Sequence, residues 1–531
     1  MGYSKKYLPL ILGLAVGTGV YLGSKLNFSN PSAKLFSSNA KKEKLNRLID
    51  YIDYEYVDEI NTDSIVDVTV NRILENLDPH SVYIPPEELE GITESMQGDF
   101  IGIGVSYYQY RDTISVINTI RGGPSEKSGI KPGDRILMAD SDTLFGEGLT
   151  RDGLADKLKG EENSRVQLKV FRKGTGVFDV EVKRGKVPLQ SVDASYMLNN
   201  DIGYIKVNRF AETTYKEFRK GINELKSSGA NEIVVDLRDN GGGFIAPALK
   251  MADEFLKEDM LIMFTKNKKG TIENNFATDE GSFEKEKIYV LINENSASAS
   301  EIFAGAIQDN DRGLIVGRRS YGKGLVQREM ALGDGSAVRL TISRYYTPTG
   351  RSIQKPYENG NKEYFNEYLE RYKNGELQSA DSIQVADSLK FKTLKGKVVY
   401  GGGGIIPDVF VGKDTTRVGE TLSYLSRSGV MGRYVFEELD QKRDFYNTIS
   451  KEDFIENYEV SSELAEGFMS YVRSRRIEIY LTDYEQELKK YIKATMAQQL
   501  FSNNLFEQIL NQDDKMIKKV LELSSRENDV N

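Results

Sequence analysis

The stretch 287-KIYVLINENSASASEIFAGAIQ-308 decides the fold, because it joins a strand to a helix through one short polar turn. KIYVLIN is an apolar run of strand length, and the residues after the turn show the apolar spacing of a helix. A turn of this kind can expose a reactive side chain at the start of the helix. The stretch therefore predicts one strand–turn–helix unit of an α/β protein.

Strand and helix patterns alternate on both sides of this stretch. The segments that show this alternation are IGYIKVNRF (202–210), NEIVVDL (231–237), APALKMADEFL (246–256) and GLIVG (313–317). Such alternation is typical of an α/β core with a largely parallel sheet. We assign the core to residues 187–358, together with residues 395–412.

The polar turn carries three serines on alternate positions, Ser296, Ser298 and Ser300. Ser298-x-x-Glu301 fits a capping box, in which the serine only satisfies a backbone amide of the first helical turn. The same position could hold a nucleophile, because the unpaired N–H groups of a helix N-terminus stabilise an oxyanion. Both interpretations stay open on this stretch alone.

Composition limits how such a serine could be activated. The chain has no cysteine and one histidine, His80, in the turn 78-DPHSVYIPPEEL-89, where a surface or turn role is expected. Thiol nucleophiles and cysteine-based zinc sites are excluded, and only one residue could be the base of a Ser-His-Asp triad. A lysine that burial keeps neutral is the main alternative base.

Lys323 lies between two glycines in 317-GRRSYGKGLVQRE-329. If residues 323–327 are extended, Lys323 and Gln327 share one face, so the amide could orient the amine. A solvated lysine in a glycine turn is the plain alternative. The stretch also matches G-x-x-x-x-G-K, but Gly324 replaces the Ser/Thr that binds magnesium, and a strand pattern follows instead of a helix. We therefore do not expect nucleotide binding.

A third glycine-rich turn, 236-DLRDNGGG-243, runs from a strand end toward a helix. Successive glycines let backbone N–H groups converge on one point, which suits an oxyanion, although an ordinary turn fits the pattern equally well. The spacing of Asp236, Asp239 and Asn240 matches no calcium loop. We predict no metal site and no cofactor.

Residues 96–186 have a different pattern, with short alternating strands, glycine turns and one short helix. They predict a separate β-rich domain that precedes the core. Residues 359–531 are expected to form a mainly helical C-terminal extension.

The N-terminus has the charge pattern of a targeting segment. Lys5 and Lys6 precede the uncharged apolar run 7–22, so residues 1–25 are expected to be a signal peptide or a membrane anchor. Positive charge before the run keeps the N-terminus inside, which puts the remainder outside the cytoplasm. A linker and a helical segment should occupy residues 26–95. The net charge of -9 and the absence of a basic patch argue against a nucleic-acid partner.

Taken together and in this order, the motifs resemble the carboxyl-terminal processing peptidases, or tail-specific proteases. The matching stretches are DLRDNGGG, NENSASASE, GRRSYGKGLVQ, 77-LDPHSVYI-84, 345-YYTPTGRSIQ-354 and 401-GGGGIIPDV-409. The resemblance implies a serine–lysine dyad, with Ser298 as nucleophile, Lys323 as base and Gln327 holding the lysine. It also implies an oxyanion hole made by the amide of Ala299 with that of Gly242 or Gly243.

The same family carries a PDZ domain, and the β-rich domain is similar to one. The loop of Gly102, Ile103, Gly104 and Val105 resembles the PDZ carboxylate-binding loop, and 122-GGPSEKSGIKPGDRIL-137 resembles its most recognisable stretch. The resemblance implies that a protein's free C-terminal tail binds there as an added strand.

The expected protein is thus an α/β serine endopeptidase with a preceding PDZ domain and helical N- and C-terminal segments. It would act on proteins or peptides with exposed C-terminal tails, at the periplasmic side of the cell envelope, anchored or exported by its N-terminus. A homo-oligomer is possible. The alternative is a proteolytically idle PDZ scaffold or chaperone of the envelope.

Overall fold

The computed structural model describes residues 40–110, 112–146, 151–477, 479 and 482–528. Residues 1–74 and 75–531 form two units, each described by itself. The expected targeting segment, 1–25, lies outside the described residues. Within the described part, none of the helices combines the length and the apolar character needed to span a membrane.

The first unit contains two helices, α2 (Ala40–Glu55) and nearly all of α3 (Thr62–Glu75). The start of α3 is capped, because the side-chain oxygen of Asn61 accepts a hydrogen bond from the Ser64 N–H at 3.1 Å. These helices agree with the apolar spacing of the sequence in this region.

The second unit is built around a six-stranded sheet with the order β10-β11-β12-β15-β16-β21. Its strands are β10 (Val192–Met197), β11 (Ile202–Val207), β12 (Glu232–Asp236), β15 (Lys287–Ile292), β16 (Leu314–Gly317) and β21 (Val409–Phe410). All neighbours are parallel except β10, which is antiparallel to β11. The prediction of an α/β core with a largely parallel sheet is confirmed.

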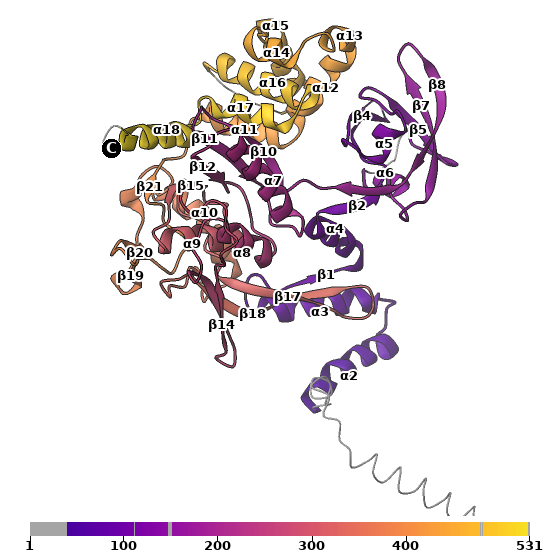
Figure 1. Cartoon of the computed structure of the whole chain (residues 1–531). Helices are drawn as coiled ribbons and strands as arrows, with labels where there is room; N and C mark the ends of the chain where they lie inside the picture. Colours follow the sequence, from indigo (N-terminus) through magenta and orange to yellow (C-terminus); the bar gives the residue numbers. More distant parts are fainter. Residues whose placement is uncertain (1–39, 111, 147–150, 478, 480–481, 529–531) are drawn as a thin grey trace, which may run out of the picture. The chain divides into compact units, whose positions relative to one another are not determined.

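Both faces of this sheet are buried, which explains why its central strands are apolar without a break. On one face pack α7 (Thr214–Ser227), α8 (Ile245–Asp253) and α9 (Ala299–Asp309). On the other face pack α17 (Asn503–Asn511) and α18 (Lys515–Asn528), from the far end of the chain (Figure 1). The last helices are therefore an integral layer of the core.

A second, antiparallel sheet lies beside the core and has the order β1-β18-β13-β14, with β17 also paired to β18. Its strands are β1 (Val82–Ile84), β13 (Leu261–Asn267), β14 (Ile272–Phe276), β17 (Leu325–Ala331) and β18 (Ala337–Tyr346). The predicted hairpin after Lys323 is confirmed as β17 and β18. The pairing of β1 with β18 brings the turn around His80 to this hairpin.

The β-rich domain is inserted between two paired strands, β2 (Asp99–Gly102) and β9 (Gly185–Pro188). Its sheet has the order β3-β4-β5-β7-β8, with β6 paired to β5. The elements are β3 (Val105–Tyr110), β4 (Thr113–Thr119), α5 (Pro124–Lys127), β5 (Arg135–Ala139), β6 (Asp142–Thr143), α6 (Arg151–Leu158), β7 (Arg165–Arg172) and β8 (Gly176–Lys183). Alternate residues of β7 are buried, as its alternating sequence predicts.

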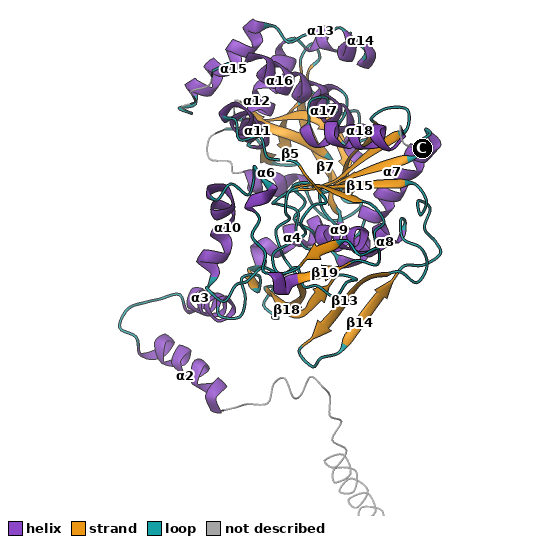
Figure 2. Cartoon of the chain, turned by 90° about the vertical axis from the view of Figure 1, so that its left-hand side faces the viewer, coloured by secondary structure: helices purple, strands orange, loops and turns teal. Residues whose placement is uncertain are grey.

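The remaining elements cover the edges and one end of the core (Figure 2). The helix α4 (Pro86–Gln97) precedes the β-rich domain, and α10 (Asn361–Lys373) and the pair β19 (Lys390–Lys392) and β20 (Val398–Tyr400) follow the second sheet. The C-terminal helices before α17 are α11 (Arg417–Arg427), α12 (Val430–Gln441), α13 (Arg443–Tyr446), α14 (Lys451–Glu456), α15 (Ser462–Ser474) and α16 (Glu485–Leu500).

Topology brings the three sequence motifs together. The glycine turn follows β12, the serine turn follows β15 and the lysine turn follows β16. These strands are parallel neighbours, so their carboxyl ends lie side by side at one edge of the sheet. This edge is where open α/β sheets place their ligands.

Candidate active site

The three serines of the turn after β15 have different surroundings. Ser296 is buried, and its hydroxyl donates to the Leu237 carbonyl at 2.8 Å. Ser300 is also buried, and its hydroxyl donates to the Asn240 carbonyl at 2.9 Å. Both outer serines thus join the serine turn to the glycine turn, and the half-buried Ser298 lies between them.

Ser298 has an unusual backbone conformation, with φ 57° and ψ -114°. A positive φ is uncommon for a residue with a side chain, and such strain collects at functional sites. A strained strand-to-helix turn is also how other hydrolases expose a nucleophile. Ser298 is the N-cap of α9, and its N–H donates to the Glu301 carboxylate at 2.8 Å. Capping and exposure of the side chain thus occur at the same residue.

Gly242 lies directly against Ser298. A Cβ on Gly242 would stand 2.7 Å from the Cβ of Ser298 and 3.1 Å from the Ala299 nitrogen. Its φ of 101° also disfavours any residue with a side chain. Gly243, with φ 144°, is pressed against the Phe210 carbonyl in the same way. The glycines therefore allow an approach of two backbones that larger residues would prevent.

The amides around Ser298 differ in whether they are already paired. The Gly242 N–H donates to the side-chain oxygen of Asn240 at 2.9 Å. Among the described residues, the N–H groups of Ala299 and Gly243 have no hydrogen-bond acceptor. Ala299 is the first residue of α9, where helical N–H groups have no partner within the helix. Ala299, which follows Ser298 in the chain, and Gly243, which follows Gly242, thus keep unpaired N–H donors.

Lys323 is held by the residue that the sequence predicted. Its ammonium nitrogen donates to Gln327 Oε1 at 2.9 Å, and the amide of Gln327 donates to the His80 carbonyl. Burial lowers the pKa of Lys323 below its usual value, and the positive charge of Arg339 lowers it further. The carboxylates of Asp78 and Glu301 oppose this shift. The net effect is a lysine that loses its proton more easily than a solvated one.

Glu301 connects the serine turn to the lysine turn. Its buried carboxylate accepts hydrogen bonds from the N–H groups of Ser298, Gly322 and Lys323 and from the Ser320 hydroxyl, at 2.6–2.8 Å. Burial raises the pKa of Glu301, and these four donors oppose the rise. The backbone nitrogens of Ser298 and Lys323 both lie 2.8 Å from one carboxylate oxygen, Oε2. The two turns are therefore fixed to each other, a role beyond the predicted cap.

His80 was expected at the surface or in a turn; the turn is confirmed, and the surface position is wrong, because the side chain is partly buried. It lies in a turn, but its Nε2 is hydrogen-bonded to the Tyr364 hydroxyl at 2.7 Å. Burial lowers the pKa of His80 to about 4, helped by the charges of Lys323 and Lys355 and opposed by Asp78. His80 is thus neutral at pH 7, and its carbonyl, not its ring, binds Gln327. The sequence signal was the family match of 77-LDPHSVYI-84.

The acidic residues of the glycine turn are paired within the protein. Asp236 accepts hydrogen bonds from Arg238 and Tyr204, and Asp239 accepts them from the side chains of Asn293 and Asn295. No cluster of three or more metal-binding side chains occurs among the described residues. These contacts favour a structural role for the two carboxylates.

The predicted tail-binding loop connects β2 to β3. Gly102 ends β2, Ile103 is buried, Gly104 has φ 74°, and Val105 begins β3. β3 is terminal in the strand order of its sheet, so one edge faces away from the other strands. Val105 also packs in the same apolar cluster as α6. This is the arrangement that β-strand addition of a peptide requires.

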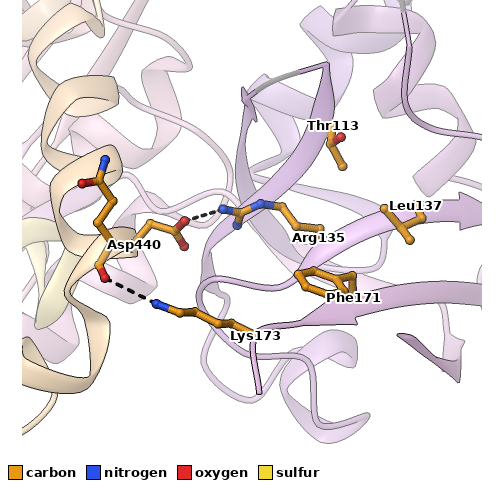
Figure 3. A pocket seen from close by; sticks show the side chains of 7 residues that line it. Thr113, Arg135, Leu137, Phe171, Lys173 and Asp440 are labelled. Atoms are coloured by element: carbon orange, nitrogen blue, oxygen red, sulfur yellow. Dashed lines mark hydrogen bonds and ion pairs between the residues drawn. The ribbon is translucent and has the colours of Figure 1, made fainter. Parts of the chain in front are cut away.

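A cavity of about 540 Å³ lies between the β-rich domain and the end of α12. Figure 3 shows Arg135 pointing from the domain toward Asp440, and Lys173 toward the Gln441 carbonyl. The cavity contains none of the motif residues, and its lining also includes Thr113, Leu137 and Phe171. It marks a loosely filled junction.

Comparison with known sequences gives three matches along the chain. The profile of peptidase family S41 matches residues 201–359, and that of the PDZ domain matches residues 101–183. A family of unknown function matches residues 421–502, within the C-terminal helices.

Among individual proteins, the carboxy-terminal processing protease CtpA of Bacillus subtilis (strain 168) is 32% identical over 320 residues, covering 60% of this chain and 68% of that protein. A probable CtpA-like serine protease of Staphylococcus aureus (strain N315) is 30% identical over 354 residues, covering 66% and 70%. The solved photosystem II D1 C-terminal processing protease aligns with a TM-score of 0.36 and 24% identity, covering 70% of this chain and 86% of that one.

Proposed function

The chain belongs to peptidase family S41, among the carboxy-terminal processing proteases with a PDZ domain, and from this premise we propose that it cleaves peptide bonds with a Ser298–Lys323 dyad through an acyl-enzyme. One observation carries the proposal. Ser298 at a strained helix start and a buried Lys323 of lowered pKa are both bound through their backbones to Glu301.

In the first step, the neutral amine of Lys323 takes the Ser298 hydroxyl proton while the oxygen attacks the substrate carbonyl. Gln327 holds the amine, and the His80 carbonyl holds Gln327. The ammonium then gives its proton to the leaving amine, and an ester on Ser298 remains. Lys323 then takes a proton from a water molecule that attacks the ester, and it returns this proton to the Ser298 oxygen as the bond to the new C-terminus breaks.

The negative oxygen that forms during attack needs donors, and we assign them to the amides of Ala299 and Gly243. Support comes from their unpaired N–H groups and from the engagement of the Gly242 amide by Asn240. Gly242 would contribute by its lack of a side chain, which lets the turn reach Ser298.

Substrate selection is assigned to the PDZ domain. The tail of a substrate would add a strand beside β3, and its carboxylate would be bound by the loop of Gly102, Ile103, Gly104 and Val105. The terminal place of β3 in its sheet and the positive φ of Gly104 support this assignment.

We also propose that the enzyme works on the extracytoplasmic side of the cell envelope. The proposal rests on Lys5, Lys6 and the apolar run 7–22. Addition of an external protease to intact spheroplasts should digest the enzyme. Its protection, with digestion only after lysis, would contradict this location.

The catalytic proposal is tested with the purified protein on an unfolded protein that carries an apolar tail. Ser298→Ala and Lys323→Ala should each remove cleavage while the affinity for a tail peptide stays unchanged. Lys220→Ala, at an exposed lysine, controls for loss of a positive charge and should cleave normally. Near-normal turnover in either dyad variant would disprove the assignment. Mass spectrometry of a slow ester substrate should detect an acyl group on Ser298.

A further inference from the structure

Arg238 lies inside the glycine-turn motif, between the end of β12 and the glycines. Its guanidinium binds two carboxylates. One belongs to Asp236, which accepts from the Arg238 Nε at 2.9 Å. The other belongs to Asp514, between α17 and α18, which accepts from the Arg238 Nη1 at 2.6 Å. The side chain of Arg238 is only 15% exposed, so both contacts are largely shielded from solvent.

Asp514 is itself fixed by two sets of contacts. Its other oxygen accepts from the N–H groups of Met516 and Ile517, at 2.9 and 3.0 Å, and so caps α18. Met516 and Ile517 pack with Val520 against the central sheet. The carboxylate that meets Arg238 is therefore held by a helix that the sheet positions.

Two further contacts join the same helices to the sheet. Glu507 of α17 accepts from the amine of Lys206 on β11 at 2.7 Å, and the Asn511 side chain donates to the Tyr196 hydroxyl at 2.7 Å. Burial alone would raise the pKa of Asp514, but the charge of Arg238 holds it below its usual value. The C-terminal helices thus present an ionised carboxylate to the glycine turn.

Arg238 lies at the start of the glycine turn, and the serine turn is hydrogen-bonded to this glycine turn. The Leu237 carbonyl accepts from the Ser296 hydroxyl, and the Asn240 carbonyl accepts from Ala297 N–H and the Ser300 hydroxyl. Asp239, between Arg238 and Asn240, has φ 59° and makes the chain turn sharply. A shift of Arg238 would therefore move the Asn240 carbonyl and the glycines after it.

We propose that Asp514 is a positioning residue that acts through Arg238 to hold the glycine turn in its oxyanion-binding geometry. The last two helices would then belong to the catalytic machinery. The inference rests on the function proposed above for Ser298 and the glycine turn. It assigns a reason for the C-terminal helices to pack on the core.

The test replaces Asp514 by asparagine, which keeps its size and an oxygen for capping α18 but turns the paired charge into an amide. We expect kcat to fall about 10- to 100-fold, because small displacements of catalytic groups have effects of this size, while KM changes less than about threefold. The matched control is Asp513→Asn, the neighbouring carboxylate, which is 57% exposed and forms ion pairs with Lys518 and Lys490. It should leave kcat within about twofold of the parent.

A second readout separates positioning from loss of folded protein. A peptide aldehyde adds reversibly to the serine and places an oxyanion in the hole, so its affinity should fall together with kcat/KM. The affinity for the matching product peptide should not change. Asp514→Glu should recover part of the lost kcat, and active-site titration corrects for any inactive fraction.

If Asp514→Asn reduces the yield of folded protein, Arg238→Lys tests the same contact from the other side. This variant keeps the positive charge but loses the planar guanidinium, which binds Asp236 and Asp514 through different nitrogens. The double variant should lose no more activity than the poorer single variant. Normal kcat and aldehyde affinity in Asp514→Asn would overturn the inference alone. Activity that persists in Ser298→Ala would instead overturn the proposed function.

Discussion

The C-terminal helices meet two neighbours in very different ways. Against the core, Glu507 of α17 pairs with Lys206, Asp514 pairs with Arg238, and α18 packs apolar side chains on the central sheet. Against the PDZ domain, α12 lines a cavity and makes the Arg135–Asp440 ion pair, a hydrogen bond from Lys173 to the Gln441 carbonyl, and ring contacts of Phe436 and Arg433 with Tyr108. The C-terminal helices thus meet the core through an apolar layer, whereas they meet the PDZ domain through contacts that surround a cavity.

The difference bears on two requirements of the proposed function: stabilisation of the transition state and selection of substrates. Transition-state stabilisation needs donors that are held in place before the reaction, and on this side the glycine turn is bound through Arg238 to Asp514. Tail capture, as proposed above, needs only a domain that stays nearby, and a junction of few contacts meets that requirement. Changes at the core should therefore alter kcat, whereas changes at the domain should alter substrate choice.

The largest effect is expected inside the core, from Lys323→Met. Activity should fall about 10⁴-fold or more, because the base is lost. The free energy of unfolding at pH 7 should rise by about 1 kcal/mol, because methionine fills the site without a buried amine. Activity assays and urea denaturation test both results, with Lys220→Met as the control. If Lys323→Met is inactive but less stable than the wild type, burial of the Lys323 amine does not destabilise the folded protein.

The same lysine predicts how wild-type activity and stability depend on pH. Because its folded pKa is lowered, kcat/KM should rise with pH, tenfold per unit, until Lys323 becomes neutral. Between that pKa and the unfolded value the unfolded chain binds more protons, so the free energy of unfolding also rises with pH. Lys323→Met should remove this part of the stability profile. An unchanged profile would contradict the lowered pKa.

The next largest effect concerns His80, at the edge of the core. The protein has a single histidine, so labelled histidine gives one NMR signal, which should titrate near pH 4 instead of 6.5. Because folding lowers this pKa, protonation of His80 favours the unfolded chain. The free energy of unfolding should therefore be unaffected by His80 above pH 6.5 and should fall by roughly 3 kcal/mol in total as the pH decreases toward 4 and below. His80→Gln should show a smaller loss over that range. A midpoint near 6.5 would contradict its burial.

A smaller effect is expected in the PDZ domain. Gly104→Asp should raise KM about tenfold for a substrate with a free C-terminal tail, because like charges meet in the carboxylate loop. The control is Gly104→Asn, which has the same backbone strain without the charge. Cleavage of a short generic peptide should be nearly unchanged in both. Equal losses on the two substrates would contradict tail binding at this loop.

The smallest effect is expected at the loose junction. Asp440→Asn removes the partner of Arg135, an ion pair that is about as shielded as Arg238–Asp514 but lies far from the serine turn, so the expected loss of stability is about 1 kcal/mol. Cleavage of a generic peptide should change by less than about twofold, while hydrogen exchange in β5 should increase. A loss of kcat as large as that of Asp514→Asn would show that both junctions hold the active site.

Much of the core could be predicted because its signals are local. The strand, turn and helix around Ser298 follow from apolar spacing, and a parallel sheet brings the turns after β12, β15 and β16 to one edge. The pairing of Lys323 with Gln327 needed only the two-residue period of an extended chain.

The rest of the site depends on contacts between distant residues, which leave no local pattern. Glu301 appeared only as a helix cap, because its bonds to the lysine turn come from residues about twenty positions later. His80 resembled a surface turn, and Tyr364, which binds it, is 284 residues away. Nothing in DLRDNGGG indicates that its arginine has a partner in Asp514. Family resemblance supplied the residue roles that geometry alone left open.

The contact between Arg238 and Asp514 spans 276 positions of the chain. A ribosome adds residues in order, so Ser298, Lys323 and the glycines are all synthesised well before the carboxylate that completes their support. During that interval the growing chain lacks the Arg238–Asp514 contact. A chain that stops before residue 514 would never form it. If Asp514 supports the glycine turn as proposed, the growing chain gains that support only after residue 514 has been added.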